Sequence, residues 1–291
     1  MINSIRIGGR LWMLDSPKVM GIINATPDSF YSGSRNLMTV GSRDNALQEL
    51  TRRVTTRVEE MLEAGADCID IGGYSSRPGC EDISAEEEYT RLCYALEGAR
   101  KAGGDTLIIS VDTFRADVAR KCVEQWGVGI INDIGGGTLD NDMFDTVADL
   151  KVAYVLMHLR GTPQTMTTLT DYEDVTRDVI SDLAFKADKL HSLGVADIIL
   201  DPGFGFAKTV DQNFRLLNDL KEFRHTGLPI LAGISRKSMI WRALDITPEE
   251  SLNGTTALNM AALMKGADIL RVHDVKEARQ CVALYQKLKD N

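Results

Sequence analysis

The sequence predicts an α/β fold, a (β/α)8 or TIM barrel, because two kinds of segment alternate along the whole chain. Short apolar, β-branched runs that end in a polar residue occur eight times in the 291 residues, and longer stretches with helical periodicity separate them. Strands that alternate with helices in this way lie parallel, and eight such pairs suit a closed barrel of this length. A doubly wound open sheet is the alternative, but it usually has fewer strands and a phosphate-binding fingerprint after the first strand.

The expected strands and helices follow one another regularly. The strands are expected at 19–25, 67–71, 107–112, 129–134, 153–158, 197–202, 229–235 and 268–274. The helices are expected at 45–64, 85–102, 116–126, 142–150, 172–193, 210–226, 248–265 and 275–288. In the first of these helices the apolar side chains recur every three or four residues and form one face that can pack on the sheet: Leu47, Leu50, Val54, Val58 and Leu62.

The N-terminal segment differs from the repeated units. The run IRIGGRLWML is typical of a short β-hairpin, with Gly8 and Gly9 at the turn, and we expect it to cover the N-terminal end of the barrel. The 7 prolines and 25 glycines are scattered, so that no linker or low-complexity stretch divides the chain. We therefore expect a single domain over 1–291, with the hairpin at 1–15 and the barrel at 16–291.

The charge balance and the cysteines exclude several classes of protein. The chain has 33 basic and 42 acidic residues, a net charge of −9, which disfavours binding to nucleic acid or to an anionic membrane surface. The five cysteines are odd in number and form no C-x-x-C pair, so neither a disulfide framework nor a structural zinc site is expected. Because no apolar run approaches the length of a membrane span, we expect a cytoplasmic protein.

Polar residues at the ends of the expected strands predict an active site, because barrels of this kind carry their catalytic residues there. Asp112, Asn132 and Asp201 together can converge on a heterocycle that has several N–H donors. Asp70 is interpreted as a residue that caps the following helix, a common role for an aspartate at a strand end. The other polar residues at or near strand ends are Asn24, His158, Ser235, Lys237, Arg271 and His273.

Cationic residues and two polar loops add to this candidate site. Basic side chains cluster at the ends of the last two strands, where barrels often bind phosphate, and this favours a phosphate site at Arg236, Lys237, Arg271 and His273. The turn-forming segments 24–36 and 74–80 are expected to be loops that close over the site. Arg77, in the second of them, is a candidate contact for an anion.

The motifs of this chain resemble those of the dihydropteroate synthase family. The run MGIINATPDSF at 20–30 is similar to the family's N-x-T-P-D-S-F signature, and DIGGYSSRPG at 70–79 is similar to its D-I-G-G-E-S-T-R-P-G loop. Six further segments match in the same order, namely SVDTFRADVA, IINDI, MHLRGTPQTM, ILDPGFGFAK, GISRKS and RVHD. The match covers nearly the whole chain, and the chain is therefore identified as a member of this family.

The resemblance implies a transferase of folate biosynthesis. Such an enzyme joins 6-hydroxymethyl-7,8-dihydropterin pyrophosphate to p-aminobenzoate and releases 7,8-dihydropteroate and pyrophosphate. The implied cofactor is Mg²⁺, the implied partners are these two small molecules, and the implied assembly is a homodimer formed through the later helices. Members of the family are also the targets of sulfonamides.

The resemblance further implies roles for individual residues. Asp112, Asn132 and Asp201 would bind the amino-pyrimidine edge of the pterin, with Lys237 at its carbonyl side. Arg271 would stack on the pterin and reach the pyrophosphate. Asn24 would bind Mg²⁺ and, together with His273, the leaving pyrophosphate. The remaining implied substrate contacts are Ser76, Arg77, Pro78, Phe206, Ser235 and Ser238, of which Arg77, Pro78, Phe206 and Ser238 would surround p-aminobenzoate. Those expected to act in catalysis are Lys237, Arg271, Asp112 and Arg77.

The chain departs from the family pattern at three positions of the first two loops. Ser32 replaces an aspartate, Tyr74 stands where glutamate is common, and Ser76 stands where threonine is common. Two alternative functions are a methyltetrahydrofolate-type methyltransferase, which shares the pterin-edge residues, and a paralogue that binds pterin without turnover. The S-R-K-S and S-S-R-P segments disfavour the methyltransferase, because they serve pyrophosphate and p-aminobenzoate.

Overall fold

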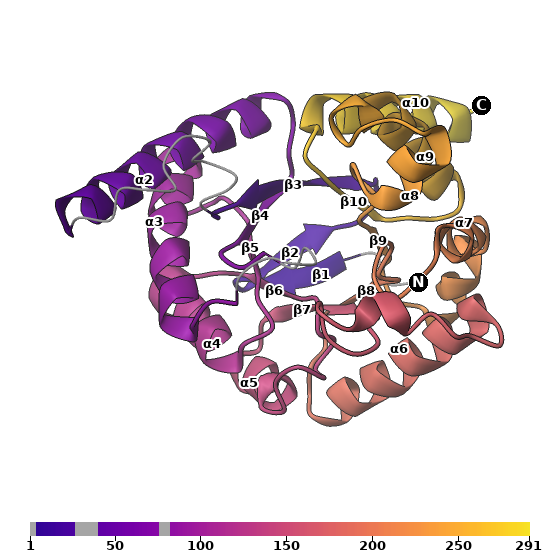
Figure 1. Cartoon of the computed structure of the whole chain (residues 1–291), viewed down its shortest axis with the longest axis horizontal. Helices are drawn as coiled ribbons and strands as arrows, with labels where there is room; N and C mark the ends of the chain where they lie inside the picture. The colour runs from indigo at the N-terminus through magenta and orange to yellow at the C-terminus, as the bar shows by residue number, and fades with distance from the viewer. Residues whose placement is uncertain (1–3, 27–39, 76–81) are drawn as a thin grey trace.

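Eight parallel strands form a barrel in the middle of the molecule, and the computed structural model describes residues 4–26, 40–75 and 82–291. The strands lie in the order β8-β7-β6-β5-β4-β3-β10-β9, and a bridge between Leu200 and Ile230 joins β8 to the chain just before β9. The predicted fold class is therefore confirmed (Figure 1). The strands are β3 (Lys18–Asn24), β4 (Cys68–Gly72), β5 (Ile109–Asp112), β6 (Ile130–Asp133), β7 (Ala153–Met157), β8 (Ile198–Asp201), β9 (Leu231–Ala232) and β10 (Ile269–Val272).

Helices surround the barrel and cover the outer face of the sheet (Figure 1). The α-helices are α2 (Val40–Glu63), α3 (Ala85–Gly103), α4 (Ala116–Trp126), α5 (Met143–Leu150), α6 (Val175–Ser192), α7 (Val210–Asn218), α8 (Ser238–Leu244), α9 (Leu252–Met264) and α10 (Val275–Lys289). The 3-10 turns are η1 (Met166–Thr168), η2 (Leu220–Thr226) and η3 (Glu249–Ser251). Of the helices that the structure describes, none combines the length and the hydropathy that crossing a membrane requires.

The alternation of side chains along each strand divides the core in two. In β4, Ile69 and Ile71 are fully buried and belong to the large apolar cluster between the sheet and the helices. Cys68 and Asp70 lie on the opposite face and point into the barrel, because successive side chains of a strand alternate. Cys68 packs there in a separate apolar cluster, whereas Asp70 is one step nearer the C-terminal end of the strand. The interior of the barrel is thus apolar at its N-terminal end and polar toward its C-terminal end.

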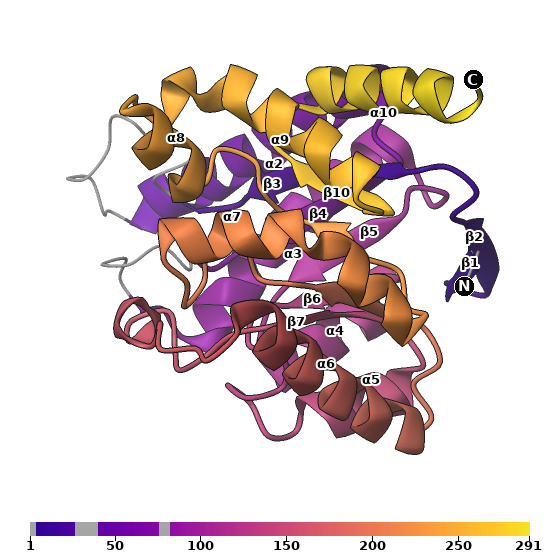
Figure 2. The same ribbon diagram turned by 90° about the vertical axis from the view of Figure 1, so that its right-hand side faces the viewer.

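The predicted hairpin is present, since β1 (Ser4–Ile7) pairs antiparallel with β2 (Arg10–Met13). Ile5 and Ile7 are buried in the same apolar cluster as the interior residues of the barrel. The hairpin therefore covers the N-terminal end of the barrel, at the right of Figure 2 and opposite α8. Glycine at position 129 makes this contact possible, because a Cβ on Gly129 would lie only 2.3 Å from Cγ2 of Ile7.

This contact between hairpin and barrel leads to a prediction about stability. Gly129→Ala is expected to lower the free energy of unfolding by about 1–3 kcal/mol, because the added methyl group overpacks the contact. Ile7→Ala is expected to lower it by about 2–5 kcal/mol through the cavity it leaves. In the double variant the new methyl group enters that space, so the combined loss in urea unfolding should be smaller than the sum of the two. A strictly additive loss would contradict the contact.

Three helical regions differ from the predicted pattern. The short helix α8 was not predicted, because its seven residues make only two turns and give too little periodicity to detect. The helix expected at 248–265 begins with the 3-10 turn η3 and becomes α-helical only in α9.

The helix expected at 210–226 is also divided. It consists of α7 followed by the 3-10 turn η2, and the backbone leaves α-helical geometry at Asp219. The carboxylate of Asp219 accepts hydrogen bonds from the hydroxyl of Thr176 and from the guanidinium of Arg215. A contact with α6 therefore accompanies the break, and the apolar pattern of the sequence does not show it.

Candidate active site

The mouth of the barrel brings charged and amide side chains together at the C-terminal ends of the strands. Asp112 of β5 and Asn132 of β6 are register partners, so their side chains start at the same level of the barrel. Asp201 ends β8, Arg271 lies in β10, and Lys237 follows β9. Both cations interact electrostatically with Asp112 and with Asp201. The five residues expected at the pterin therefore lie around one place.

Arg271 is the centre of the hydrogen-bond network at this place. Its Nε donates to Oδ2 of Asp70 at 2.6 Å, and its Nη2 donates to Oδ2 of Asp112 at 2.7 Å. Nδ2 of Asn132 donates to the same Oδ2 of Asp70 at 2.9 Å. The interpretation of Asp70 as a helix cap is therefore wrong: its side chain is fully buried inside the barrel and pairs with a residue 201 positions away. The local sequence could not show this partner.

Burial sets the protonation behaviour of the acid and the base in this network. Burial raises the pKa of Asp112 to about 7, and the charge of Arg271 opposes the rise without cancelling it. Burial alone would lower the pKa of Arg271, but the carboxylates of Asp70 and Asp112 outweigh it and raise that pKa above its ordinary value. Arg271 therefore stays charged, whereas Asp112 titrates near neutral pH.

Asp201 is held by the tight turn that follows β8. The N–H of Gly203 donates to its Oδ1 at 2.7 Å, and Gly203 adopts a φ of +71°, in the left-handed region that favours glycine. A Cβ on Gly203 would also lie 2.2 Å from the carbonyl oxygen of His158, so no larger residue fits. Burial raises the pKa of Asp201, and the nearby charge of Lys237 lowers it. One oxygen of this carboxylate is thus committed to the turn, and Oδ2 is directed toward Gly233.

The ammonium group of Lys237 also lies close to Gly233. A Cβ on Gly233 would lie 3.6 Å from Oδ2 of Asp201 and 3.7 Å from Nζ of Lys237. The ammonium group donates to the carbonyl of Phe204 at 2.5 Å and lies 4.7 Å from the centre of the Phe206 ring. Burial lowers the pKa of Lys237 to about 8, and the charge of Asp201 limits the decrease. The carboxylate of Asp201 and the ammonium group of Lys237 therefore both lie close to Gly233, which has no side chain.

A second lysine, to which the sequence analysis gave no role, holds the turn that follows β8. Lys208 is buried, and its Nζ lies 3.1 Å from Nδ1 of His158 and 3.0 Å from the carbonyl oxygens of Gly203 and Phe206. Burial lowers the pKa of Lys208 to about 7 and that of His158 to about 2, so the imidazole is neutral, and its Nδ1 accepts a hydrogen bond when Lys208 is protonated. These contacts give His158, which directly follows β7, a structural role. Lys208 is the last residue of the motif ILDPGFGFAK. A lysine in this otherwise mostly apolar motif is the sequence feature that could have identified it.

The cationic cluster expected at the last two strands is only partly assembled. The hydroxyl of Ser235 lies 3.0 Å from Nδ1 of His273 and accepts the backbone N–H of the same histidine at 3.2 Å. Arg236 instead forms a two-point ion pair with Asp274, with both distances at 2.9 Å, and donates to the carbonyls of residues 248 and 249. Its assignment to the phosphate group was therefore wrong, because its donors are already used to hold the loop.

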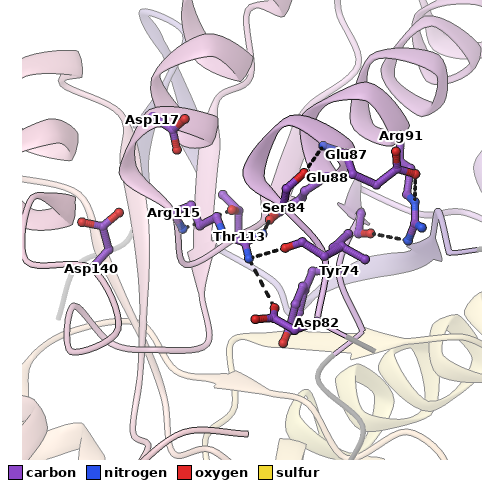
Figure 3. Close-up of polar contacts among 12 residues, drawn as sticks. Tyr74, Asp82, Ser84, Glu87, Glu88, Arg91, Thr113, Arg115, Asp117 and Asp140 are labelled. Atoms are coloured by element: carbon purple, nitrogen blue, oxygen red, sulfur yellow. Dashed lines mark hydrogen bonds and ion pairs between the residues drawn. The ribbon is translucent and has the colours of Figure 1, made fainter. Parts of the chain in front are cut away.

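The chain on both sides of the second loop is held by a cluster around Arg115 (Figure 3). Arg115 pairs with the fully buried carboxylate of Glu88 and donates to the carbonyl of Ile83 at 2.7 Å. Its guanidinium lies over the rings of Tyr74 and Phe114, at 5.4 and 4.9 Å from their centres. Tyr74, which stands where the family commonly has glutamate, therefore contacts the same arginine as the chain beyond the loop.

Some of the other predicted site residues lie in the part of the chain that the structure describes, and some lie outside it. Asn24 is the last residue of β3, half-buried, and its place in the alternation puts it on the interior side of the barrel. Ser238 is half-buried at the first position of α8. Ser32, Ser76, Arg77 and Pro78 lie outside the described residues. Within the described parts of the chain, no three His, Cys, Asp or Glu side chains are grouped so that they could hold a metal ion.

Fold and site together define a barrel enzyme whose mouth offers acceptors and cations to an N–H-rich, negatively charged small molecule. The family model described as "Pterin binding enzyme" matches residues 20–273. The dihydropteroate synthase of a Synechocystis species is 42% identical over 265 residues, which cover 90% of this chain and 86% of that protein. The chain belongs to the dihydropteroate synthase family of pterin-binding enzymes.

Solved structures agree with this assignment. The Xanthomonas albilineans dihydropteroate synthase with 4-aminobenzoic acid superposes with a TM-score of 0.87 at 33% identity, and each chain is covered fully. The Yersinia pestis dihydropteroate synthase in complex with a sulfonamide drug gives a TM-score of 0.86 at 33% identity, covering 99% of this chain and 100% of the other. The predicted family, barrel fold, dihydropteroate synthase function and transferase class are therefore confirmed.

Proposed function

We propose that the residues at the barrel mouth carry out the condensation of 6-hydroxymethyl-7,8-dihydropterin pyrophosphate with p-aminobenzoate. The observation that carries this proposal is the joint placement of three acceptors and two cations in one pocket, connected through Arg271. The pterin edge presents several N–H donors, and carboxylate acceptors bind such donors through strong, charge-assisted hydrogen bonds. Arg271 and Lys237 can at the same time attract the pyrophosphate group.

Each pocket residue has a role that follows from its free acceptor or donor. Asp201 offers Oδ2, Asp112 offers the carboxylate that Arg271 partly neutralises, and Asn132 offers its amide oxygen to the pterin edge. Lys237, beside Asp201 at Gly233, can donate to the carbonyl side of the ring.

The reaction is a displacement at the exocyclic carbon of the pterin. The amine nitrogen of p-aminobenzoate forms the new C–N bond, the C–O bond to the pyrophosphate breaks, and the pyrophosphate leaves with the electron pair. The amine then loses a proton to solvent. Arg271 of β10 and His273, which directly follows that strand, would stabilise the negative charge that develops on the leaving group. Such a displacement needs no covalent intermediate with a side chain.

The protein ligands present suit a Mg²⁺ ion that binds together with the substrate, which supplies the other ligands. Asn24 supplies one neutral amide oxygen, and no three acidic, histidine or cysteine side chains are grouped for a metal in the described residues. Mg²⁺ often keeps several waters and takes its other ligands from substrate phosphates, so a single protein ligand is sufficient. When bound, the ion would neutralise charge on the leaving pyrophosphate. Asn24 would hold it at the C-terminal end of β3.

The p-aminobenzoate subsite is proposed on the side of Lys237 and Phe206. The ring of Phe206 contacts the Lys237 ammonium group, and Ser238 follows directly at the first turn of α8. Ser235, which holds His273, completes this side of the pocket. Ser76, Arg77 and Pro78 would enclose the ligand from the second loop. The relatives with bound 4-aminobenzoic acid and with a sulfonamide drug support this subsite and a sulfonamide sensitivity of this chain.

The pH dependence of pterin binding tests the roles of Asp112 and Lys237. Asp112 accepts hydrogen bonds best when ionised, above about pH 7, and Lys237 donates as an ammonium group, below about pH 8. We therefore expect affinity for 6-hydroxymethyl-7,8-dihydropterin to be maximal between these two pH values. It should fall about tenfold per pH unit below the lower value (the acidic limb) and above the higher one (the alkaline limb). The alcohol is used because a phosphate group itself titrates near pH 6.

Calorimetric titration from pH 5.5 to 9.5 measures both limbs. Lys237→Arg keeps the positive charge throughout this range, so it should remove the alkaline limb and leave the acidic one. An affinity that is flat from pH 6 to 9 would contradict both assignments.

An assay on the purified protein tests the function as a whole. Incubation with dihydropterin pyrophosphate, p-aminobenzoate and Mg²⁺ should yield dihydropteroate and pyrophosphate in equal amounts. Methyl transfer from methyltetrahydrofolate would instead indicate the methyltransferase, and pterin binding without product would indicate a non-catalytic paralogue.

We further propose that the chain is a single cytoplasmic domain that forms a homodimer through α8, α9 and α10. Four large apolar side chains are exposed on these neighbouring helices, where a second copy could cover them: Leu244, Met264, Leu284 and Leu288. Sedimentation of the wild type should give twice the monomer mass. Charged substitutions at Met264 and Leu284 together should shift it to the monomer.

A further inference from the structure

We propose that Asp70 is a positioning residue of the pterin pocket, which orients Arg271 and Asn132 through a single carboxylate oxygen. Oδ2 of Asp70 accepts the Arg271 Nε–H at 2.6 Å and the Asn132 Nδ2–H at 2.9 Å. The side chain is fully buried inside the barrel, below the register of Asp112. It therefore supports the pocket from beneath and acts on the ligand only through the two residues it holds. The inference rests on the proposed function, because those two residues are the proposed pterin contacts.

The first consequence concerns the direction of the Asn132 amide. A carboxylate can only accept, so the amide end that faces Asp70 has to be the NH₂ group. The other end, Oδ1, is then the one available to a ligand. Asp70 thereby makes Asn132 an acceptor toward the pterin, and the pocket selects a ring that presents an N–H at this position. A ring with a lone pair there would face another lone pair.

The second consequence concerns Arg271. Its guanidinium is held at Nε by Asp70 of β4 and at Nη2 by Asp112 of β5, and these two bonds from neighbouring strands fix its plane. Asp112 is nearer the mouth and is itself a proposed pterin contact, so a bound pterin competes for it. The bond to Asp70 lies deeper and stays intact. Arg271 consequently keeps its orientation when the ligand engages Asp112.

The cost of burying Asp70 supports a role in the pocket over a role in folding. Oδ1 of Asp70 is buried and makes no hydrogen bond to any residue that the structure describes. The same holds for Oγ of Ser110, the register partner of Asp70 on β5. A buried ion pair with an unsatisfied oxygen contributes little to stability compared with apolar packing. All the connections of this carboxylate lead through Oδ2 to pterin-contacting residues.

A double-mutant cycle on pterin affinity tests the proposal. Asp70→Asn is expected to weaken binding of 6-hydroxymethyl-7,8-dihydropterin about 30-fold and Arg271→Lys about 100-fold. Because part of the effect of Asp70 passes through Arg271, the loss of affinity in the double variant should be clearly smaller than the product of the two single losses. Ser110→Ala, which removes a neighbouring buried oxygen without touching either bond, is the matched control and should stay within about twofold of the wild type. Independent, multiplicative losses would overturn the proposal.

A second measurement uses the wild-type protein and does not depend on whether Asp70→Asn folds. With ¹⁵N-labelled arginine, the Nε–H signal of Arg271, assigned by its loss in Arg271→Lys, should be protected from exchange with and without pterin. Loss of that protection on pterin binding would show that Asp70 releases Arg271 and would overturn the proposal. If the wild type does not bind pterin at all, the proposed function fails. If it binds and Asp70→Asn binds equally well, only this inference fails.

Discussion

Asp201→Asn is expected to weaken binding of dihydropterin pyrophosphate by about 30- to 1,000-fold, which corresponds to about 2–4 kcal/mol. The turn after β8 gives the reason. The Gly203 N–H donates to Oδ1 of Asp201, so an asparagine there would keep its oxygen on Gly203 and turn its NH₂ group into the pocket. A donor would then face the N–H donors of the pterin, and the charge opposite Lys237 would be lost.

Calorimetric titration with the pterin pyrophosphate measures this loss. Asp197→Asn is the matched control, because it makes the same change just before β8, at the opposite end of the strand, where Asp197 accepts from the backbone of Arg6. The control should bind the pterin as the wild type does. Unchanged affinity in Asp201→Asn would remove that residue from the site.

Removal of Mg²⁺ is expected to abolish turnover, with a loss of at least about 100-fold that added Mg²⁺ reverses. Pyrophosphate carries several negative charges, and the described part of the site offers few cations that are not already paired: Arg271 is shared between Asp70 and Asp112, and Arg236 is bound to Asp274. Pyrophosphate alone should accordingly bind more tightly when Mg²⁺ is present. Product formation after exhaustive chelation, followed by titration with Mg²⁺, is the measurement.

Two variants of Asn24 test whether its side chain binds the Mg²⁺ ion. Asn24→Asp keeps an oxygen in place and should retain activity at low Mg²⁺. Asn24→Leu has a similar size and no oxygen, so it should need about tenfold more Mg²⁺ for half-maximal rate. Full turnover of the chelated wild type would refute the role of the ion, and equal Mg²⁺ requirements of the two variants would refute the role of Asn24.

The barrel could be predicted because its signal is local and repeated. A strand such as β4 alternates between Ile69 or Ile71 on the helix side and Cys68 or Asp70 on the interior side, and each unit of the chain repeats this kind of pattern. Errors arose where the signal was short or interrupted, as in the two turns of α8. A two-turn helix carries too few residues for periodicity to distinguish it from a loop.

The sequence predicted most of the residues that form the candidate site, but not which of their side chains bind one another. Asp112, Asn132 and Asp201 end strands, and parallel strands bring such ends to one face of a barrel. The sequence could not separate Lys237, which faces the pocket, from its neighbour Arg236, which binds Asp274. Arg236 adopts a left-handed φ of +55°, and this turn of the backbone sends adjacent cations to different partners.

The sequence by itself determined that this protein is a parallel barrel with acceptors and cations at one end, and that it belongs to a pterin-binding family. Only the tertiary structure decided which of these groups pair with one another. Asp70 has the local setting of a helix cap, yet it binds Arg271 from the last strand, and Lys208 is buried against His158, which is 50 residues away. Propensity and periodicity depend on neighbours in the chain, whereas the partner of a buried charge depends on which strands and loops the barrel places side by side, as it does with β3 and β10 where the ring closes.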